Sequence, residues 1–184
     1  MFLKIFSRSL ITFSKNWIAL AALVVFLLFG AFILPGQSAA ADVYSSEVGS
    51  PDLSLFYSAN DIYQIAEQYG PAGRDAYVRA RYSFDLIFPL VYGFFLITVI
   101  SWFLGKLTNE PGQLRLINLT PIAGMFFDFL ENISASIVIS RYPKSSPIFA
   151  NLAPIFTFTK WLFVGGSFLI LIISGLFFLV HKKK

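Results

Sequence analysis

The stretch that decides the fold is FDLIFPLVYGFFLITVISWFL, residues 84–104, in which Asp85 is the only charged residue. Its length matches the roughly 20 apolar residues with which an α-helix crosses the hydrocarbon core of a bilayer. Three further apolar runs occupy about residues 17–34, 116–140 and 154–180. We therefore predict an all-α integral membrane protein, a four-helix bundle whose chain crosses the bilayer four times.

The composition agrees with a membrane protein. Of the 184 residues, 57% are hydrophobic and 13% are charged, and the mean hydropathy is +0.71. Soluble domains, by contrast, have about a quarter of their residues charged. Four spans already take up nearly half of a chain of this length, so we expect residues 1–184 to form a single transmembrane domain.

Several functions are excluded by residue types and motifs that the sequence lacks. It has no cysteine, which rules out disulfides, iron–sulfur clusters and cysteine nucleophiles, and its one histidine, His181, stands in the tail. No phosphate loop, nucleotide fingerprint or metal-binding histidine pair is present. We therefore expect no metal and no cofactor. The net charge of +4 comes from Lys and Arg that flank the apolar runs, so we expect no nucleic-acid partner.

Residues 35–83 are polar and predict a small helical cap between the first and second membrane helices. Ser58 followed by Asp61 is the pattern of a capping box, and Gly70-Pro71 is a stop signal, so a short amphipathic helix should lie between them. We expect a second helix to start near Gly73 and to run directly into the span at 84–104.

The first apolar run allows two interpretations. Its length and its basic N-terminal flank fit a retained membrane helix, whereas Ser38-Ala39-Ala40 resembles the cleavage site of a signal peptide. Because the run is longer than the roughly 7–15 residues of a signal-peptide core, we predict that the helix is retained.

The distribution of Lys and Arg sets the predicted orientation. One side carries Lys4, Arg8, Lys15, Lys106, Arg115, Lys182, Lys183 and Lys184. The other side carries Arg74, Arg79, Arg81, Arg141 and Lys144. Since basic residues favour the cytoplasmic side, we predict that both termini are cytoplasmic and that the cap faces the opposite side of the membrane.

Four charged residues stand inside or at the edge of the predicted spans, where charge is costly and usually marks function. They are Asp85, Asp128, Glu131 and Lys160. Asp128, Glu131 and Asn132 follow one another at helical spacing, so they share one face of the third span. Because the third and fourth spans run in opposite directions, we expect Lys160 to pair with Glu131 or Asp128.

The start of the second span adds further polar groups. Arg81 precedes Asp85 by four residues, and Tyr82 and Tyr92 bracket Pro89. A proline inside a helix kinks it and frees the backbone carbonyl one turn earlier. A kinked helix with a polar lining would help to open a cavity.

The charges have more than one interpretation. They could simply tie the helices together, or they could form an ion path, although no histidine lies within the spans. Alternatively, two carboxylates one turn apart, one of them protonated, could bind a cationic or hydroxyl-bearing ligand or act as an acid–base pair. The candidate ligand-binding residues are Arg81, Tyr82, Asp85, Tyr92, Asp128, Glu131, Asn132 and Lys160.

Two segments, RARYSFDLIFP at 79–89 and DFLEN at 128–132, resemble a pattern in uncharacterised bacterial membrane proteins, which implies a bacterial inner membrane. The predicted architecture is similar to the emopamil-binding (EXPERA-like) family, which includes sterol isomerases and a lipid-binding receptor. That resemblance implies a cavity for sterol-like or amine ligands, faced here by Asp85, Asp128 and Glu131. The sequence departs from the family in having no intramembrane histidine of the kind that such an isomerase would use.

These observations lead to two hypotheses of function. In the first, the protein binds a lipid-like or amphiphilic small molecule in an acid-lined cavity within the membrane, anchored by Asp128 and Glu131. An isomerase-like reaction would use either carboxylate as proton donor or acceptor, and the sequence leaves open whether the protein is an enzyme. In the second, it is a non-catalytic structural or accessory subunit, whose partner is another membrane protein or a second copy of the chain.

Overall fold

The structure is a computed structural model that describes residues 1–107 and 113–181, and within these residues it contains helices and no strand. The α-helices are α1 (Phe2–Phe13), α2 (Asn16–Leu28), α3 (Leu34–Ser45), α4 (Ala59–Gln68), α5 (Gly70–Arg81), α6 (Phe84–Leu107), α7 (Thr120–Arg141) and α8 (Pro147–His181). Three short elements join them: a π-helical turn η1 (Phe29–Ile33) and two 3₁₀ segments, η2 (Pro51–Leu53) and η3 (Gln113–Leu119).

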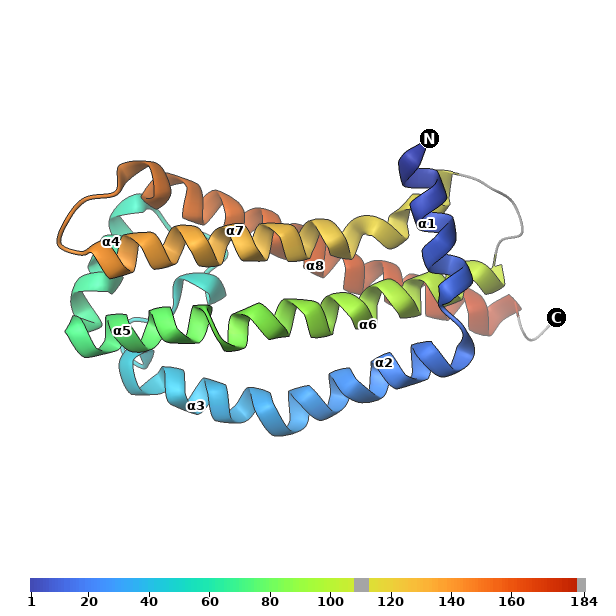
Figure 1. The fold of residues 1–184 in the computed structure, drawn as a ribbon, viewed down its shortest axis with the longest axis horizontal. Coiled ribbons are helices and arrows are strands. Elements are labelled where there is room, and N and C mark those ends of the chain that lie inside the picture. Colours follow the sequence, from blue (N-terminus) through green and yellow to red (C-terminus); the bar gives the residue numbers. More distant parts are fainter. Residues whose placement is uncertain (108–112, 182–184) are drawn as a thin grey trace.

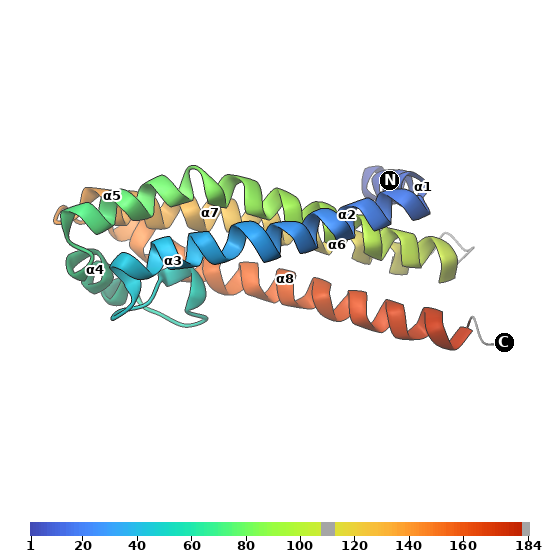
Figure 2. The ribbon, with the colours of Figure 1, turned by 90° about the horizontal axis from the view of Figure 1, so that it is seen from below.

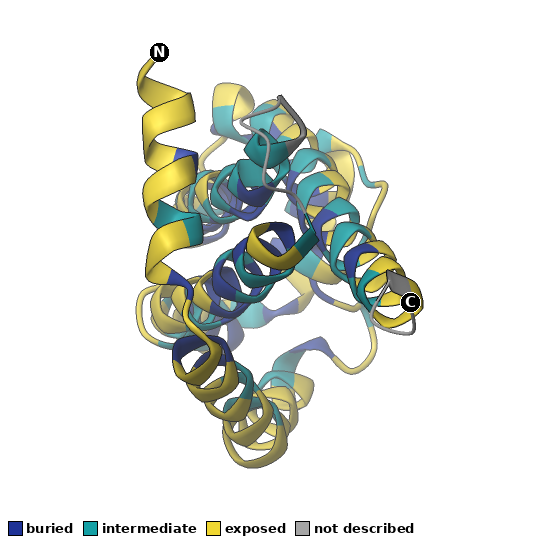
Figure 3. Cartoon of the chain, turned by 90° about the vertical axis from the view of Figure 1, so that its right-hand side faces the viewer, coloured by how far each residue is buried: buried dark blue, intermediate teal, exposed yellow. Residues whose placement is uncertain are grey.

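In the part of the chain that the structure describes, four helical rods are long and apolar enough to cross a membrane: Asn16–Ser45, Gly70–Leu107, Arg115–Arg141 and Pro147–Val180. They lie alongside one another, with both chain termini at the same end of the bundle (Figure 1). We call this the termini end, and the opposite end, which carries α4, the far end. Exposed residues cover the outward faces of the rods (Figure 3). The predicted all-helical bundle with four membrane-length helices is therefore confirmed.

The first rod is longer than predicted. The sequence indicated a polar cap from residue 35, but α3 continues the helix to Ser45. Residues 37–41 are Gln, Ser and three alanines, and alanine is the strongest helix former, so the change to polar residues does not end the helix. The π-helical turn η1 stands just before Pro35, where the missing N–H of the proline interrupts the regular hydrogen-bond ladder.

The predicted capping box is present at the start of α4. Ser58 accepts a hydrogen bond from the backbone N–H of Asp61, and Asp61 accepts one from the backbone N–H of Ser58 at 2.7 Å. Gly70 has a φ of +62°, a conformation that glycine adopts without strain, and it separates α4 from α5. The expected helix that leads into the second span is α5, which begins at Gly70, three residues before the predicted start.

Two apolar clusters hold the bundle together. At the far end, residues of α4 and α5 such as Ile62 and Tyr77 pack against the α7 and α8 segments around Val138 and Ala150. Nearer the termini end, α6 supplies most of a second cluster around Leu96. Along α7 and α8, the charged residues Asp128, Glu131 and Lys160 stand between these two clusters.

Small residues permit close packing of α7 on α8, at a position that the sequence did not indicate. By sequence, Gly165-Gly166 and Gly175 of α8 are candidates for a close helix contact. A Cβ added at Gly165 or Gly166 would meet nothing within 4 Å, and one at Gly175 would meet only the ring of Phe103 in α6, at 3.5 Å. The close approach is at Gly124 of α7, where a Cβ would lie 2.9 Å from Cγ2 of Val164. The contact therefore uses a glycine of α7 rather than those of α8.

The N-terminal segment forms a helix of its own. α1 lies across the termini end, at a large angle to the rods (Figures 1 and 2). Ser7, which is 1% exposed, donates to the carbonyl of Arg115 at 2.9 Å, and the side-chain amide of Asn118 donates to the carbonyl of Ser7 at 3.2 Å. These hydrogen bonds fix α1 to η3.

Candidate ligand-binding site

The predicted polar face of α7 points into the bundle. Asp128, Glu131 and Asn132 are 9%, 1% and 3% exposed. From α8, Lys160 places its Nζ 2.5 Å from Oε2 of Glu131 and 3.9 Å from Oδ1 of Asp128. The structure thus brings Lys160 to both of the carboxylates with which its pairing was predicted.

A second ion-pair group is centred on Arg81, at the end of α5. Its guanidinium lies 2.9 Å from Oδ2 of Asp85, one helical turn further along the chain. It also lies 2.9 Å from Oδ1 of Asp52 in η2 and stacks over the ring of Tyr77, 4.4 Å from the ring centre. Because Arg81 is 6% exposed, one buried cation is shared between two carboxylates from separate parts of the chain.

Pro89 creates a backbone connection between the ion-pair group at Arg81 and the ion-pair group at Lys160. Since proline has no N–H, the carbonyl of Asp85, one turn earlier, loses its usual helical donor. The side-chain amide of Asn132 donates to this carbonyl at 3.3 Å and also contacts Oδ1 of Asp128 at 3.4 Å. The hydroxyl of Tyr92 donates to Oδ2 of the same carboxylate at 2.8 Å. Asp128 is therefore held by both α6 and α7.

The η2 segment closes over these side chains. The backbone carbonyl of Asp52 accepts a hydrogen bond from the indole of Trp161 at 2.9 Å and one from Lys160 at 3.5 Å. Ser50 donates to the carboxylate of Asp52. Burial alone would raise the pKa of Asp52, but the charges of Arg81 and Lys160, together with the Ser50 hydrogen bond, hold it below its ordinary value. Asp52 is thus a charged tether between η2, α5 and α8.

A cavity of about 380 Å³ lies beneath η2. Its polar side is formed by ion-pair residues of five elements, η2, α5, α6, α7 and α8, and its apolar side by aromatic and aliphatic residues of the rods. The polar lining includes Asp52, Arg81, Asp85, Tyr92, Asp128 and Lys160. The apolar lining includes Phe26, Leu34, Phe84, Phe88, Val164 and Phe168. One concave space therefore offers charge on one side and hydrocarbon on the other.

The cavity reaches the surface between α3 and α8. Gln37, Ser38 and Asp42 of α3 line it and are exposed, and Trp161 on the α8 side is 37% exposed. The main packing partners of α3 are α5 and η1, whereas α8 packs on α7 and α6. Toward the termini end, the rings of Phe26 and Phe168, with centres 6.3 Å apart, close the space.

The structure gathers seven of the eight candidate residues and separates one. Tyr82 is 51% exposed and does not line the cavity, because it caps the end of α5 on its outer side. Glu131 and Asn132 are buried but do not line the cavity. Glu131 contacts Lys160 and Asn132 contacts Asp128, and these two partners do line it. Of the two proposed anchors, only Asp128 faces the cavity.

Sequence reasoning missed Asp52 and Trp161 as parts of the site. Asp52 looked like one of several acidic residues in a polar loop, and nothing in its neighbourhood indicates a partner 29 residues away. The only local signal is Ser50-Pro51-Asp52, a turn-forming run, which predicts a bend but no long-range contact.

The arrangement favours particular ligand chemistry. The cavity is lined by the carboxylates of Asp52, Asp85 and Asp128, and Glu131 lies behind this lining. The carboxylates outnumber the two cations of the site, Arg81 and Lys160. An excess of carboxylates suits a group that donates hydrogen bonds, such as an amine or a hydroxyl. Among the described residues, no group of three or more His, Asp or Glu is placed to hold a metal ion.

Comparison with protein-family profiles, with curated proteins and with solved structures gave no significant match.

Proposed function

We propose that this chain is a multi-pass membrane protein that binds a lipid-like amphiphile in the cavity beneath η2. The headgroup is an amine or hydroxyl that donates to Asp128, and the hydrocarbon tail leaves between α3 and α8. The observation that carries the proposal is the two-sided lining, in which Asp128 and Phe88 face the same space of about 380 Å³. Small-molecule sites typically combine an apolar wall with a few convergent polar groups.

The lateral opening supports a ligand that arrives from the bilayer. The exposed residues of α2 and α8 include many large apolar side chains, such as Leu20, Leu27, Leu162 and Leu169. Helices that are apolar on their outer faces fit a lipid surround. In our proposal the opening lies where the apolar outer face of α8 meets the polar residues Gln37, Ser38 and Asp42 of α3, so an amphiphile enters with its tail along α8 and its polar end beside α3.

Of the two carboxylates that the sequence singled out, Asp128 is the ligand contact in this proposal. Its side chain is 13% exposed, whereas that of Glu131 is 1% exposed. Glu131 acts as the countercharge that positions Lys160. If the protein also moves a proton on its ligand, Asp128, with Tyr92 donating to it, is the group that reaches the cavity.

The test is native mass spectrometry of gently purified protein, titrated with dodecylamine, dodecanol and dodecanoate. The three probes share a chain and differ in headgroup. The proposal expects the cavity beneath η2 to take the amine and the alcohol and to take the carboxylate far more weakly, so the comparison counts only the binding that is lost on Ala41→Trp. Ala41→Trp places a large side chain in the cavity lining and should abolish binding. Ala40→Trp, on the same helix but outside the lining, should keep it.

Two outcomes would count against this function. Equal binding to the Ala41→Trp and Ala40→Trp variants would show that the probes coat the apolar surface. A wild-type protein that retains no small molecule but co-purifies with a second protein would favour the accessory-subunit hypothesis instead. Asp128→Asn separates the two hypotheses further, because it should weaken amine binding while the bundle remains folded.

The membrane topology is tested separately, in intact cells. We propose that both termini face the cytoplasm, because the segments flanking the apolar runs on the side of the termini carry more Lys and Arg than those on the side of the cap. The chain has no cysteine, so single substitutions such as Asn60→Cys in α4 and Ser9→Cys in α1 can be labelled cleanly. In intact cells, a membrane-impermeant maleimide should label only the first.

A further inference from the structure

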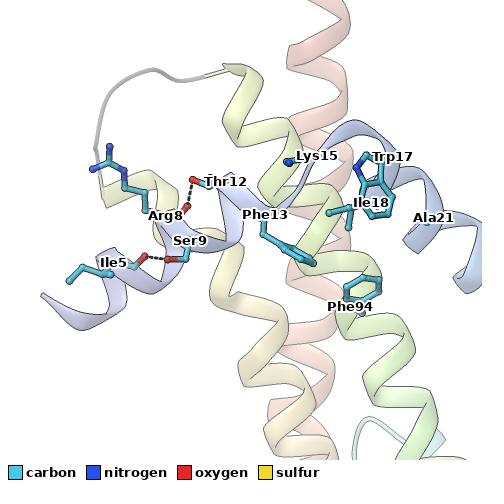
Figure 4. Close-up of a pocket in the computed structure, with 10 residues that line it drawn as sticks. All are labelled: Ile5, Arg8, Ser9, Thr12, Phe13, Lys15, Trp17, Ile18, Ala21 and Phe94. Atoms are coloured by element: carbon cyan, nitrogen blue, oxygen red, sulfur yellow. Dashed lines mark hydrogen bonds between the residues drawn. The ribbon is translucent and has the colours of Figure 1, made fainter.

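A second concave site lies at the termini end, in the corner where α1 meets α2 and α6 (Figure 4). This groove has a volume of about 970 Å³ and shares no lining residue with the cavity beneath η2. Its apolar lining includes Phe13, Trp17, Ile18 and Phe94, and its basic lining residues are Arg8 and Lys15. The proposed function does not use any of these residues.

The groove is part of the fold because α1 is firmly attached. Ser7 of α1 and Ser14, the residue that follows α1, do not line the groove and are 1% and 5% exposed. Ile11 packs on α6, where a Cβ added to Gly105 would lie 3.2 Å from its Cγ2. With α1 held in this way, the angle between α1 and α2 is fixed.

The apolar part of the groove is open to its surroundings. Phe13, Trp17 and Phe94 are 50%, 69% and 42% exposed, and Figure 4 shows them around the space between α1 and α2. Tryptophan is enriched where a membrane helix meets the headgroup region. Ala21 lies six residues beyond Lys15 on α2, so at about 1.5 Å per residue the lining descends roughly 9 Å along the rod.

The polar part of the groove is cationic. Arg8 and Lys15 are exposed, and none of the lining residues is acidic. The hydroxyls of Ser9 and Thr12 donate to the carbonyls of Ile5 and Arg8 within α1, at 3.1 and 3.0 Å. The hydroxyl protons are therefore engaged within the helix, and the two cations are the groups available to a ligand. Together with the apolar wall, they are complementary to an anion that carries a hydrocarbon chain.

We infer that this groove binds one anionic phospholipid, with its phosphate between Arg8 and Lys15 and an acyl chain along Ile18, Ala21 and Phe94. α1 then lies in the plane of the membrane interface, as amphipathic helices with basic residues do, while α2 and α6 descend into the hydrocarbon. The inference requires membrane insertion but is independent of any ligand in the cavity beneath η2.

The experiment uses native mass spectrometry with dioleoyl phosphatidylglycerol and dioleoyl phosphatidylcholine, which have the same chains. Wild-type protein should prefer the anionic lipid. Each basic residue near an anionic lipid surface is worth about fivefold in affinity, so Arg8→Gln/Lys15→Gln should weaken phosphatidylglycerol binding roughly twentyfold to thirtyfold. Both residues are exposed, so the double variant should unfold at the wild-type temperature.

The matched control is Lys4→Gln/Lys106→Gln, which removes two exposed charges outside the groove lining. This variant should retain most of the lipid preference, and an equal loss would overturn the inference in favour of general positive charge. Ala21→Trp should reduce binding of the lipid, whereas Leu20→Trp, outside the lining, should not.

Two further results would also overturn the inference. One is equal affinity for phosphatidylcholine, and the other is displacement of the lipid by glycerol phosphate, which has the headgroup chemistry but no chain. Dodecylamine binding should be unchanged in the Arg8→Gln/Lys15→Gln variant. Loss of the phosphatidylglycerol preference therefore tests the groove, and loss of dodecylamine binding tests the cavity beneath η2.

Discussion

Asn132 of α7 donates from its side-chain amide to the backbone carbonyl of Asp85 in α6, at 3.3 Å. That carbonyl lacks its helical donor because Pro89 stands one turn later. The hydrogen bond therefore repairs the interruption that the proline creates, and it brings the polar face of α7 to the start of α6. This one relationship aligns Asp85 and Asp128 on the same cavity.

This hydrogen bond predicts that substitutions of Asn132 and Pro89 have coupled effects on the free energy of unfolding. Asn132→Ala should lower the free energy of unfolding by about 1 kcal/mol, since it leaves a buried carbonyl without a donor. In a Pro89→Ala background the new N–H supplies that donor, so the same change should cost clearly less. Unfolding in mixed micelles measures both values. Pro154→Ala, in α8, is the control background, and an equal cost of Asn132→Ala in all three backgrounds would contradict the assignment.

Lys160 should be essential to the stability of the bundle. It is 6% exposed and lies 2.5 Å from Glu131, so Lys160→Met leaves a buried carboxylate without its countercharge. Removing one partner of a buried pair typically costs about 3 kcal/mol or more. Lys160→Met/Glu131→Gln should recover part of this loss, because neither charge remains. A double variant that is less stable than Lys160→Met would show that Glu131 does not depend on Lys160.

Periodicity and charge patterns in the sequence were sufficient for the general architecture and for part of the site. Apolar run lengths predicted four long helices, and helical spacing on α7 with opposite helix directions predicted the approach of Lys160 to Asp128 and Glu131. The proline rule also predicted a freed carbonyl in the second span. Each of these inferences depends on local geometry or on simple antiparallel order.

The remaining features depend on contacts between distant segments. Asp52 reaches Arg81 only because η2 folds back over the rods, and no spacing rule relates a loop residue to a helix 29 residues later. Likewise, Glu131 was predicted to face the cavity together with Asp128. Sequence spacing places both on one side of α7, but it cannot distinguish which of them the neighbouring helix covers, and α8 covers Glu131.

The tether at Asp52 should make stability depend on acid pH. The pKa of Asp52 in the folded protein lies below its ordinary 3.8, because Arg81 and Lys160 outweigh its burial. A depressed folded-state pKa contributes stability that is complete above the unfolded pKa and is lost as the pH falls through the folded one. Asp52→Asn should therefore lower the Tm at pH 7, and the difference from wild type should shrink below pH 3.8.

Thermal unfolding between pH 3 and pH 7 would measure this effect at Asp52. Glu47→Gln removes an exposed carboxylate from the same loop and should leave the Tm at pH 7 unchanged. A Tm difference for Asp52→Asn that stays constant down to pH 3 would mean that the charge of Asp52 is not what holds η2.

Close packing of α7 on α8 makes Gly124 and Gly165 respond differently to the same change. Gly124→Ala places a Cβ 2.9 Å from Cγ2 of Val164 and 3.4 Å from its backbone nitrogen, so the helices must separate or Val164 must shift. Overpacking of this kind costs about 1 to 3 kcal/mol. At Gly165 an added Cβ meets nothing within 4 Å, and alanine is the better helix former, so Gly165→Ala should be neutral or slightly stabilising.

Because Val164 also lines the cavity, Gly124→Ala should weaken dodecylamine binding as well as stability, whereas Gly165→Ala should change neither adversely. Unfolding and binding measured on the two variants would test this, and equal behaviour of both would place the close contact elsewhere.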